Sequence, residues 1–237
     1  MRLGRIAFAA VGLWHVMTAV PAAAALSKLA GGGVVRSPVL FPAPVGAVPV
    51  AMRTHRVLIE LSPGRALINH RILLFNPNQR SSHLEMGLPR NGSFQHPVVA
   101  RVALDTLRNL EVRVEGRPVP IFQEPDTFSA SGIRLAIPES YRDSVWSWYL
   151  WRSECPAWSE LLMQISYEVQ TGPATLARGI NLRQGFFVAA LLEQPRGWGG
   201  PLDCLLVFLR VSDGMGWSDI FGRYPDVFIR FGEDLAC

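Results

Sequence analysis

Apolar residues recur at every second position in short segments separated by glycine and proline, and this pattern restricts the chain to β structure. The clearest alternating set comprises Leu161, Met163, Ile165, Tyr167 and Val169. Successive side chains of a strand point to opposite faces, so this spacing predicts one buried and one exposed face. The chain has 21 glycines and 18 prolines, and we find no helical periodicity of useful length in its first half. The sequence therefore predicts an all-β fold.

Roughly ten short strands are expected, which is typical of β-sandwich architecture. Two hairpins are predicted, one from residues 56–61 and 66–75 and one from residues 110–114 and 119–122. The tryptophan-rich segment 145–151 is expected to pair with 161–169 across the connection 153–159. Continuous apolar runs at 186–192 and 205–211 are expected to form strands covered on both sides.

The N-terminus has the three parts of a secretory signal peptide. Two arginines lie within residues 1–5, an apolar run follows at 6–20, and small residues suited to signal peptidase occupy 21–25. The run is shorter than the roughly twenty residues that a membrane-spanning helix needs. We therefore expect residues 1–25 to be a cleaved signal peptide, with no stable membrane span afterwards. The protein is expected to be exported to the periplasm or the extracellular space.

The rest of the chain is divided by composition. Residues 26–50 are expected to form an extended, edge-like lead-in, because prolines at 38, 42, 44 and 49 exclude helix and interrupt sheet ladders. Two β-sandwich-like (immunoglobulin-like) domains are then predicted. The first covers 51–138, and the second is a tryptophan-rich C-terminal β domain at 139–237.

Charge argues against a nucleic-acid partner. Loss of the leader removes Arg2 and Arg5, so 21 basic residues remain against 19 acidic ones, a balance of +2. The basic residues are dispersed among acidic ones, whereas nucleic-acid binding requires a clustered excess.

Three cysteines lie in the second half of the chain, and an oxidising compartment permits one pair to bridge. We favour a disulfide between Cys155 and Cys204, because each lies close to a strong predicted strand. A bridge between Cys204 and Cys237, or no bridge, remains an alternative.

The sequence offers no coherent catalytic or metal-binding set, so no enzyme activity and no cofactor are predicted. His83 and Glu85 share one strand face and His96 lies nearby, but this spacing is not specific for zinc, and no metal site is predicted. His70 is interpreted as a hydrogen-bonded interior or edge histidine. Ser218, within 216–219, imitates a hydrolase nucleophile without the strand-turn-helix context of that motif.

Six tryptophans fall between residues 146 and 217, and their bulk favours core filling. The alternative is a stacking platform for sugars. Trp198 and Trp217, in glycine-rich loops, are the candidates for exposure and for a ligand or partner surface.

Several segments in order resemble one family of exported bacterial proteins, the domain of unknown function 4424 family. The resemblance covers nearly the whole mature chain and rests on residues 50–59, 75–77 with 87–89, 112–119, 148–151, Tyr167 with Gly172, and 198–202. The chain departs from the family pattern at Cys155-Pro156, where a Phe-Pro step is usual, and in a shortened central region. The resemblance implies an envelope location and β structure, with no catalytic residues to transfer.

The expected function is that of a non-catalytic exported envelope protein, a structural or interaction module whose partner is an envelope protein or a glycan. The alternative is a carbohydrate-binding module that uses exposed tryptophans.

Overall fold

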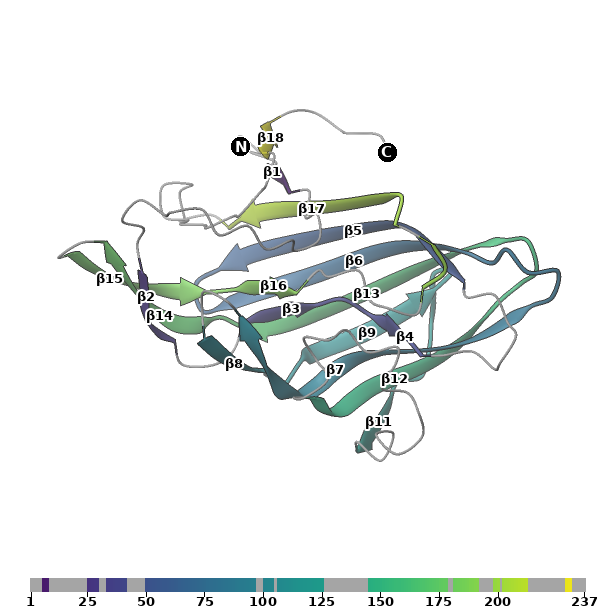
Figure 1. Ribbon diagram of the computed structural model, residues 1–237, viewed down its shortest axis with the longest axis horizontal. Helices are drawn as coiled ribbons and strands as arrows, with labels where there is room; N and C mark the ends of the chain where they lie inside the picture. Colours follow the sequence, from purple (N-terminus) through teal and green to yellow (C-terminus); the bar gives the residue numbers. More distant parts are fainter. Residues whose placement is uncertain are drawn as a thin grey trace.

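The computed structural model describes residues 6–8, 25–29, 33–41, 50–96, 100–104, 106–125, 145–178, 181–191, 198–200, 202–212 and 229–231. Within these ranges every regular element is a β-strand, which confirms the predicted all-β, sandwich-like fold (Figure 1). No helix in these ranges is long and apolar enough to cross a membrane.

The largest sheet has eight strands in the order β10-β9-β13-β6-β5-β17-β1-β18. In that order the strands span Arg117–Pro118, Arg108–Val114, Glu160–Gln170, Arg65–Phe75, Ala51–Ser62, Cys204–Val211, Ile6–Phe8 and Ile229–Phe231. Figure 1 shows its long central strands lying side by side. All neighbours are antiparallel except β5 and β17, which run parallel.

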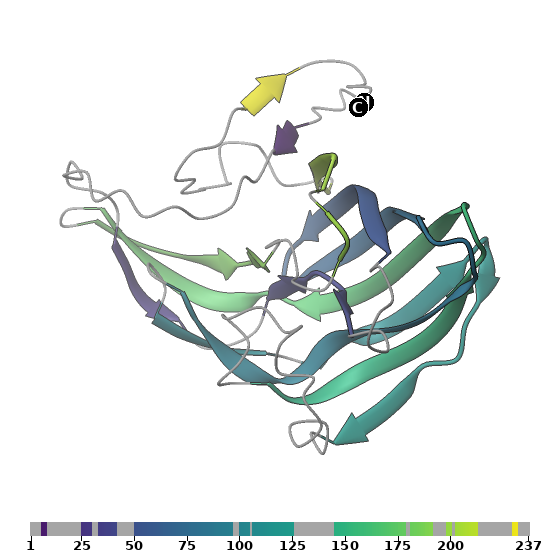
Figure 2. The same cartoon turned by 45° about the vertical axis from the view of Figure 1, so that its right-hand side comes forward.

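The second sheet has five strands in the order β11-β12-β7-β4, with β8 also paired to β7. These strands span Phe122–Pro125, Val145–Cys155, Ser82–His96, Val39–Leu40 and Ala100–Leu104. Two small sheets complete the fold: β15-β14-β2 (Asn181–Phe187, Gly172–Arg178, Ala25–Leu29) and the parallel pair β16-β3 (Ala189–Leu191, Val34–Arg36). In the turned view the layer of β7 and β12 separates from the layer of β5 and β6 (Figure 2).

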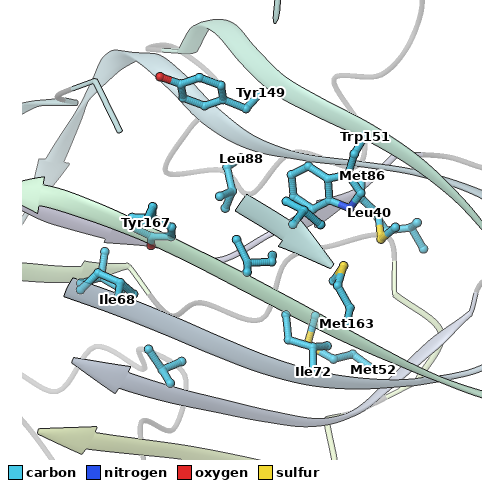
Figure 3. Packing of buried hydrophobic residues seen from close by; sticks show 14 of the residues in the cluster. Leu40, Met52, Ile68, Ile72, Met86, Leu88, Tyr149, Trp151, Met163 and Tyr167 are labelled. Atoms are coloured by element: carbon cyan, nitrogen blue, oxygen red, sulfur yellow. The ribbon is translucent and has the colours of Figure 1, made fainter. Parts of the chain in front are cut away.

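One hydrophobic core fills the space between the two large sheets. It takes inward residues from β5, β6, β13 and β9 on one side and from β7 and β12 on the other. All five apolar residues of the alternating set at 161–169 are buried, as predicted. Side chains of both sheets meet in Figure 3, where Met163 of β13 and Ile72 of β6 lie across the core from Met86 and Trp151. Burial of this apolar surface is the main stabilising contribution to such a fold.

The first predicted hairpin forms as expected, and the second forms with a different return strand: β10 is Arg117–Pro118 rather than 119–122, and Phe122 belongs to β11 of the other large sheet. β5 and β6 pair over their full length around a turn at Pro63-Gly64. In the second hairpin, β9 and β10 flank Glu115 and Gly116, whose φ angles are 49° and 76°. Two consecutive positive φ angles match a two-residue turn whose twist suits a hairpin, and glycine adopts one of them without strain.

The predicted boundary at residue 138 does not separate two sheet systems. β13, from the predicted C-terminal domain, lies between β6 and β9 of the predicted N-terminal domain, and β12 pairs with β7. The strands of both halves therefore share sheets, because each half buries its apolar faces against the other.

The predicted pairing of 145–151 with 161–169 is wrong. β12 and β13 belong to opposite sheets, and the chain crosses between the sheets at residues 156–159. Asn76 holds this crossing, since its Nδ2 donates to the carbonyl oxygens of Cys155 and Pro156, both at 2.9 Å. With β12 and β13 in opposite sheets, the apolar face of each strand packs against the other sheet and is buried. If the two strands were neighbours in one sheet, their apolar faces would lie on the same side and could not cover each other.

The predicted lead-in is extended, and its strands lie at sheet edges as expected: β2 and β4 are terminal strands of their sheets, and β3 belongs to a two-stranded sheet. Residues 33–41 are all buried and contain β3 and β4. β4 pairs with β7, and the Phe41 amide donates to the Glu85 carbonyl at 2.9 Å. Pro38 lies between β3 and β4, outside both ladders, so it removes no ladder hydrogen bond.

Candidate functional site

The outer face of the eight-stranded sheet carries two rows of side chains that run across four strands. Register places Arg56, Arg71, Gln164 and Arg113 in one row, on β5, β6, β13 and β9. The next row contains Leu58, Asn69, Ser166 and Glu111. These residues occupy the outward positions of strands whose intervening residues form the core, so strand alternation alone brings them to one surface.

A groove of about 300 Å³ opens on this face. Its lining comes from all three strands β6, β9 and β13, and consists of Asn69, Glu111, Arg113, Gln164, Ile165 and Ser166. Amide, hydroxyl and carboxylate groups provide both donors and acceptors here. The groove is therefore suited to a polar solute.

Charge is unevenly balanced along the arginine row. Glu111 Oε1 lies 2.8 Å from both Nε and Nη2 of Arg113, so this guanidinium is neutralised. Arg56 and Arg71 lie directly opposite each other, and neither forms an ion pair with a described residue. Like charges in this cross-strand position are unfavourable, which makes the pair available to an anion.

A second polar cluster lies inside the sandwich. His55 Nε2 is 2.9 Å from His70 Nδ1, and His70 Nε2 is 3.1 Å from the Tyr167 hydroxyl. That hydroxyl donates to the Arg36 carbonyl at 3.1 Å and accepts from the Arg36 amide at 2.8 Å. The three rings also stack, with centroids 5.1 and 5.5 Å apart. His70 is thus the hydrogen-bonded interior histidine that the sequence predicts.

One arrangement of protons satisfies every hydrogen bond that links His55, His70, Tyr167 and the Arg36 carbonyl. If His55 Nε2 carries hydrogen and donates to His70 Nδ1, then His70 Nε2 carries hydrogen and donates to Tyr167. The Tyr167 proton is then free to reach the Arg36 carbonyl. We assign both histidines this neutral tautomer from the hydrogen-bond network.

Burial sets the titration of this cluster. It lowers the pKa of His55 from 6.5 to about 4. The pKa of His70 is lowered well below 6.5 by burial and by the neighbouring His55. Burial likewise raises the pKa of Tyr167 above its ordinary value. All three groups are neutral at physiological pH, and the imidazoles are 2% exposed. The cluster is closed to solutes.

The cluster ties the two sheets together. Arg36, fully buried on β3, donates from Nη1 to the carbonyl oxygens of Pro89 at 2.6 Å and Arg90 at 3.4 Å, on β7. Through Tyr167 it reaches β13 and the histidines of β5 and β6. A buried hydrogen-bond network of this kind fixes the relative positions of the elements that it connects.

The predicted surface tryptophan Trp198 is instead buried, with 7% of its surface exposed, and it belongs to the core. The adjacent Gly199 amide donates to the Val50 carbonyl at 2.8 Å, which holds this glycine-rich loop against the sheet. Trp217 lies outside the described residues. Trp148 and Trp151 are buried, and Trp158, in the turn after β12, is 62% exposed. Core filling is therefore correct for three of these tryptophans.

The predicted disulfide between Cys155 and Cys204 is not formed, because Cys155 is a buried free thiol. Cys155 ends β12 in the five-stranded sheet, whereas Cys204 begins β17 in the eight-stranded sheet, opposite Thr54. Their different sheets explain why sequence proximity to strong strands was misleading. The alternative partner, Cys237, lies outside the described residues.

His83 and Glu85 do share one face of β7. His83 is exposed, and Glu85 lies 3.4 Å from Arg152 Nη2 on β12. Within the described ranges no group of three or more His, Cys, Asp or Glu side chains is placed to hold a metal ion.

The comparisons with known proteins identify no family for this chain. No family model matches the chain, and no curated protein matches it. A solved structure called a "putative nutrient binding protein", from Legionella pneumophila, shares 14% identity with a TM-score of 0.41. The match covers 64% of this chain and 46% of that protein, so this chain spans about half its length.

Proposed function

We propose that the chain is a non-catalytic binding module of the cell envelope, exported by the predicted leader, and that it binds its ligand on the outer face of the eight-stranded sheet. The proposal rests on where the polar groups lie: those that could exchange protons are buried, and those that are accessible line the groove. The imidazoles and the Tyr167 hydroxyl, which could exchange protons, are enclosed and already bonded to each other. The accessible groove offers amides, a hydroxyl and an internally paired Glu111–Arg113.

Groups of this kind favour binding over chemistry. Nucleophilic catalysis requires a nucleophile next to a general base, and general acid–base catalysis requires a proton-transferring group that reaches the substrate. Ser166, the hydroxyl of the groove, is flanked in its row by Asn69 and Glu111, and Glu111 is held by Arg113. The groove therefore supports recognition of a polar ligand through hydrogen bonds.

A carbohydrate is the ligand class that the groove favours. Sugar hydroxyls act as donors and acceptors, which matches Asn69, Gln164 and Ser166. The carbohydrate-binding alternative thus moves from the tryptophans to this polar face, because Trp198 is part of the core.

A panel of immobilised glycans tests the proposal with the full-length chain and two variants. Ser166→Tyr places a large ring in the groove, and Gln123→Tyr places the same ring at an exposed position on β11 as the matched control. We expect the unsubstituted chain and Q123Y to retain the same glycans and S166Y to lose them. A blank panel, retention unaffected by S166Y, or turnover of a glycan would refute the proposal.

A further inference from the structure

We infer that the groove takes an acidic glycan built from uronic acid units, with Arg56 and Arg71 binding the carboxylate. This inference rests on the proposed function and names the ligand class for the same groove.

Arg56 and Arg71 supply two positive charges at one end of the row. Both are exposed, and they face each other on adjacent antiparallel strands. Opposed residues of such strands have Cα atoms about 5 Å apart. Two guanidinium groups at this separation bracket one carboxylate, and arginine binds carboxylates through paired, charge-assisted hydrogen bonds. A bound carboxylate also relieves the repulsion between the two arginines.

The groove also contains a hydrogen-bond acceptor, the carboxylate of Glu111. Glu111 lies in the groove two strands from Arg71 and can only accept hydrogen bonds when ionised. Its carboxylate is paired with Arg113 and keeps further lone pairs that can accept from a hydroxyl of the ligand. The ligand must therefore combine a carboxylate with hydroxyl groups that lie some distance from it.

The length of the row and the order of its residues determine where each part of the ligand would lie. Neighbouring strands are ~4.8 Å apart, so the row from Arg56 to Arg113 extends over about 14 Å. A short oligosaccharide laid across the strands places its carboxylate over β5 and β6 and its hydroxyls over Asn69, Gln164 and Ser166. Five of the six groove residues are polar and none is aromatic, whereas the centre of a protein–protein interface is depleted in charge and rich in aromatic residues.

Binding of tri-galacturonic acid to the full-length chain tests this inference by titration calorimetry. The comparison ligand is the same trisaccharide with methyl-esterified carboxyl groups, which keeps the hydroxyls and removes the charge. The variants are Arg56→Gln with Arg71→Gln, and Arg80→Gln as the control. Arg80 is exposed in the turn after β6, and it contributes its main-chain carbonyl to Asn76, which the substitution keeps.

We expect the acid to bind at least tenfold more tightly than the ester, and R56Q/R71Q to remove that preference. Binding should weaken as salt is added, since the arginines are exposed. The melting temperature of R56Q/R71Q should be unchanged or higher, because a repulsive pair is removed. R80Q should bind as the unsubstituted chain does.

The outcomes separate this inference from the proposed function. Equal binding of acid and ester, or full binding by R56Q/R71Q, overturns the carboxylate assignment while groove-dependent glycan binding stands. Failure of both trisaccharides to bind also overturns it, and the S166Y comparison on the glycan panel then decides the proposed function. Binding of anionic vesicles or of an acidic protein through the same arginines, without the trisaccharide, would assign the row to a different partner.

Discussion

The buried histidine pair predicts how stability depends on pH. Below pH 6.5 an unfolded chain protonates its histidines, whereas folded His55 stays neutral until about pH 4. The unfolded state then binds more protons, so stability falls as pH decreases from 6.5 and the loss levels off below about 4. Each pKa unit is worth about 1.4 kcal/mol, so His55 alone accounts for a loss of about 3 kcal/mol by pH 4. His70, whose pKa is also lowered well below 6.5, adds a further loss that begins at the same pH of 6.5.

Urea unfolding at pH 7.5, 5.5 and 4 measures this effect. Carboxylates titrate in the same range, so the relevant quantity is the difference in unfolding free energy between the unsubstituted chain and His55→Leu/His70→Leu. We expect this difference to change by more than about 3 kcal/mol between pH 7.5 and 4, in favour of the variant at low pH, because His55 alone contributes about 3 kcal/mol and His70 adds to it. Q123Y, which changes an exposed residue of β11 and removes no ionisable group, serves as control and should show a constant difference.

A constant difference for H55L/H70L would refute the assignment of two buried neutral imidazoles. If that variant does not fold, NMR titration of the unsubstituted chain supplies the same test. The imidazole signals of His55 and His70 should keep their neutral shifts from pH 7.5 to 5.

Four further substitutions or reactions test the remaining contacts. Gly87→Ala should lower stability by about 1–3 kcal/mol in urea titrations, because the new Cβ would lie 2.7 Å from Leu150 Cδ2 and 2.9 Å from the Tyr149 carbonyl; unchanged stability would contradict this packing. Tyr167→Phe should lower it by about 1–3 kcal/mol by leaving buried polar groups without their hydroxyl, and a neutral effect would argue against the cluster. Trp198→Ala should lower it by about 3–5 kcal/mol; a stable variant with reduced glycan binding would instead restore the surface prediction. Cys155 should resist alkylation in the folded protein and react without reductant once unfolded, as mass spectrometry can show; protection after unfolding would indicate a disulfide.

Local periodicity was sufficient to predict the long strands β5, β6, β12, β13 and β17, but it did not predict β1 to β4, β8 or β14. The alternation at 161–169 predicted five buried residues, and the turn residues at 63–64 and 115–116 marked both hairpins. Alternation is set by the geometry of a single strand, so it can be recognised without knowing the partner strand.

Sheet assignment was not predictable in the same way. β12 and β13 are adjacent in sequence and both rich in apolar residues, which suits a hairpin as well as a crossing between sheets. The crossing depends on Asn76, a residue 79 positions before Cys155, and on burial of both inward faces. The error at Trp198 has a similar origin, since a glycine-rich loop looks exposed until its contact with Val50 is known.

The candidate site was missed for the same reason. Arg56 and Arg71 each occupy an ordinary outward position, and only the register of β5 against β6 places them opposite each other. The buried cluster left a clearer trace. His55 and His70 fall at inward positions of their strands, and Arg36 follows two valines in an apolar segment. A polar residue at a buried position requires a hydrogen-bond partner, so each of these positions indicated a buried polar contact.

The central claim, that the ligand lies on the outer polar face of the eight-stranded sheet, is tested most directly by NMR. Titration with tri-galacturonic acid should shift the side-chain amide signals of Asn69 and Gln164, which project from neighbouring strands into the groove, and leave the indole signal of the exposed Trp158 unchanged. Shifts at Trp158 with unchanged Asn69 and Gln164 signals would contradict the account.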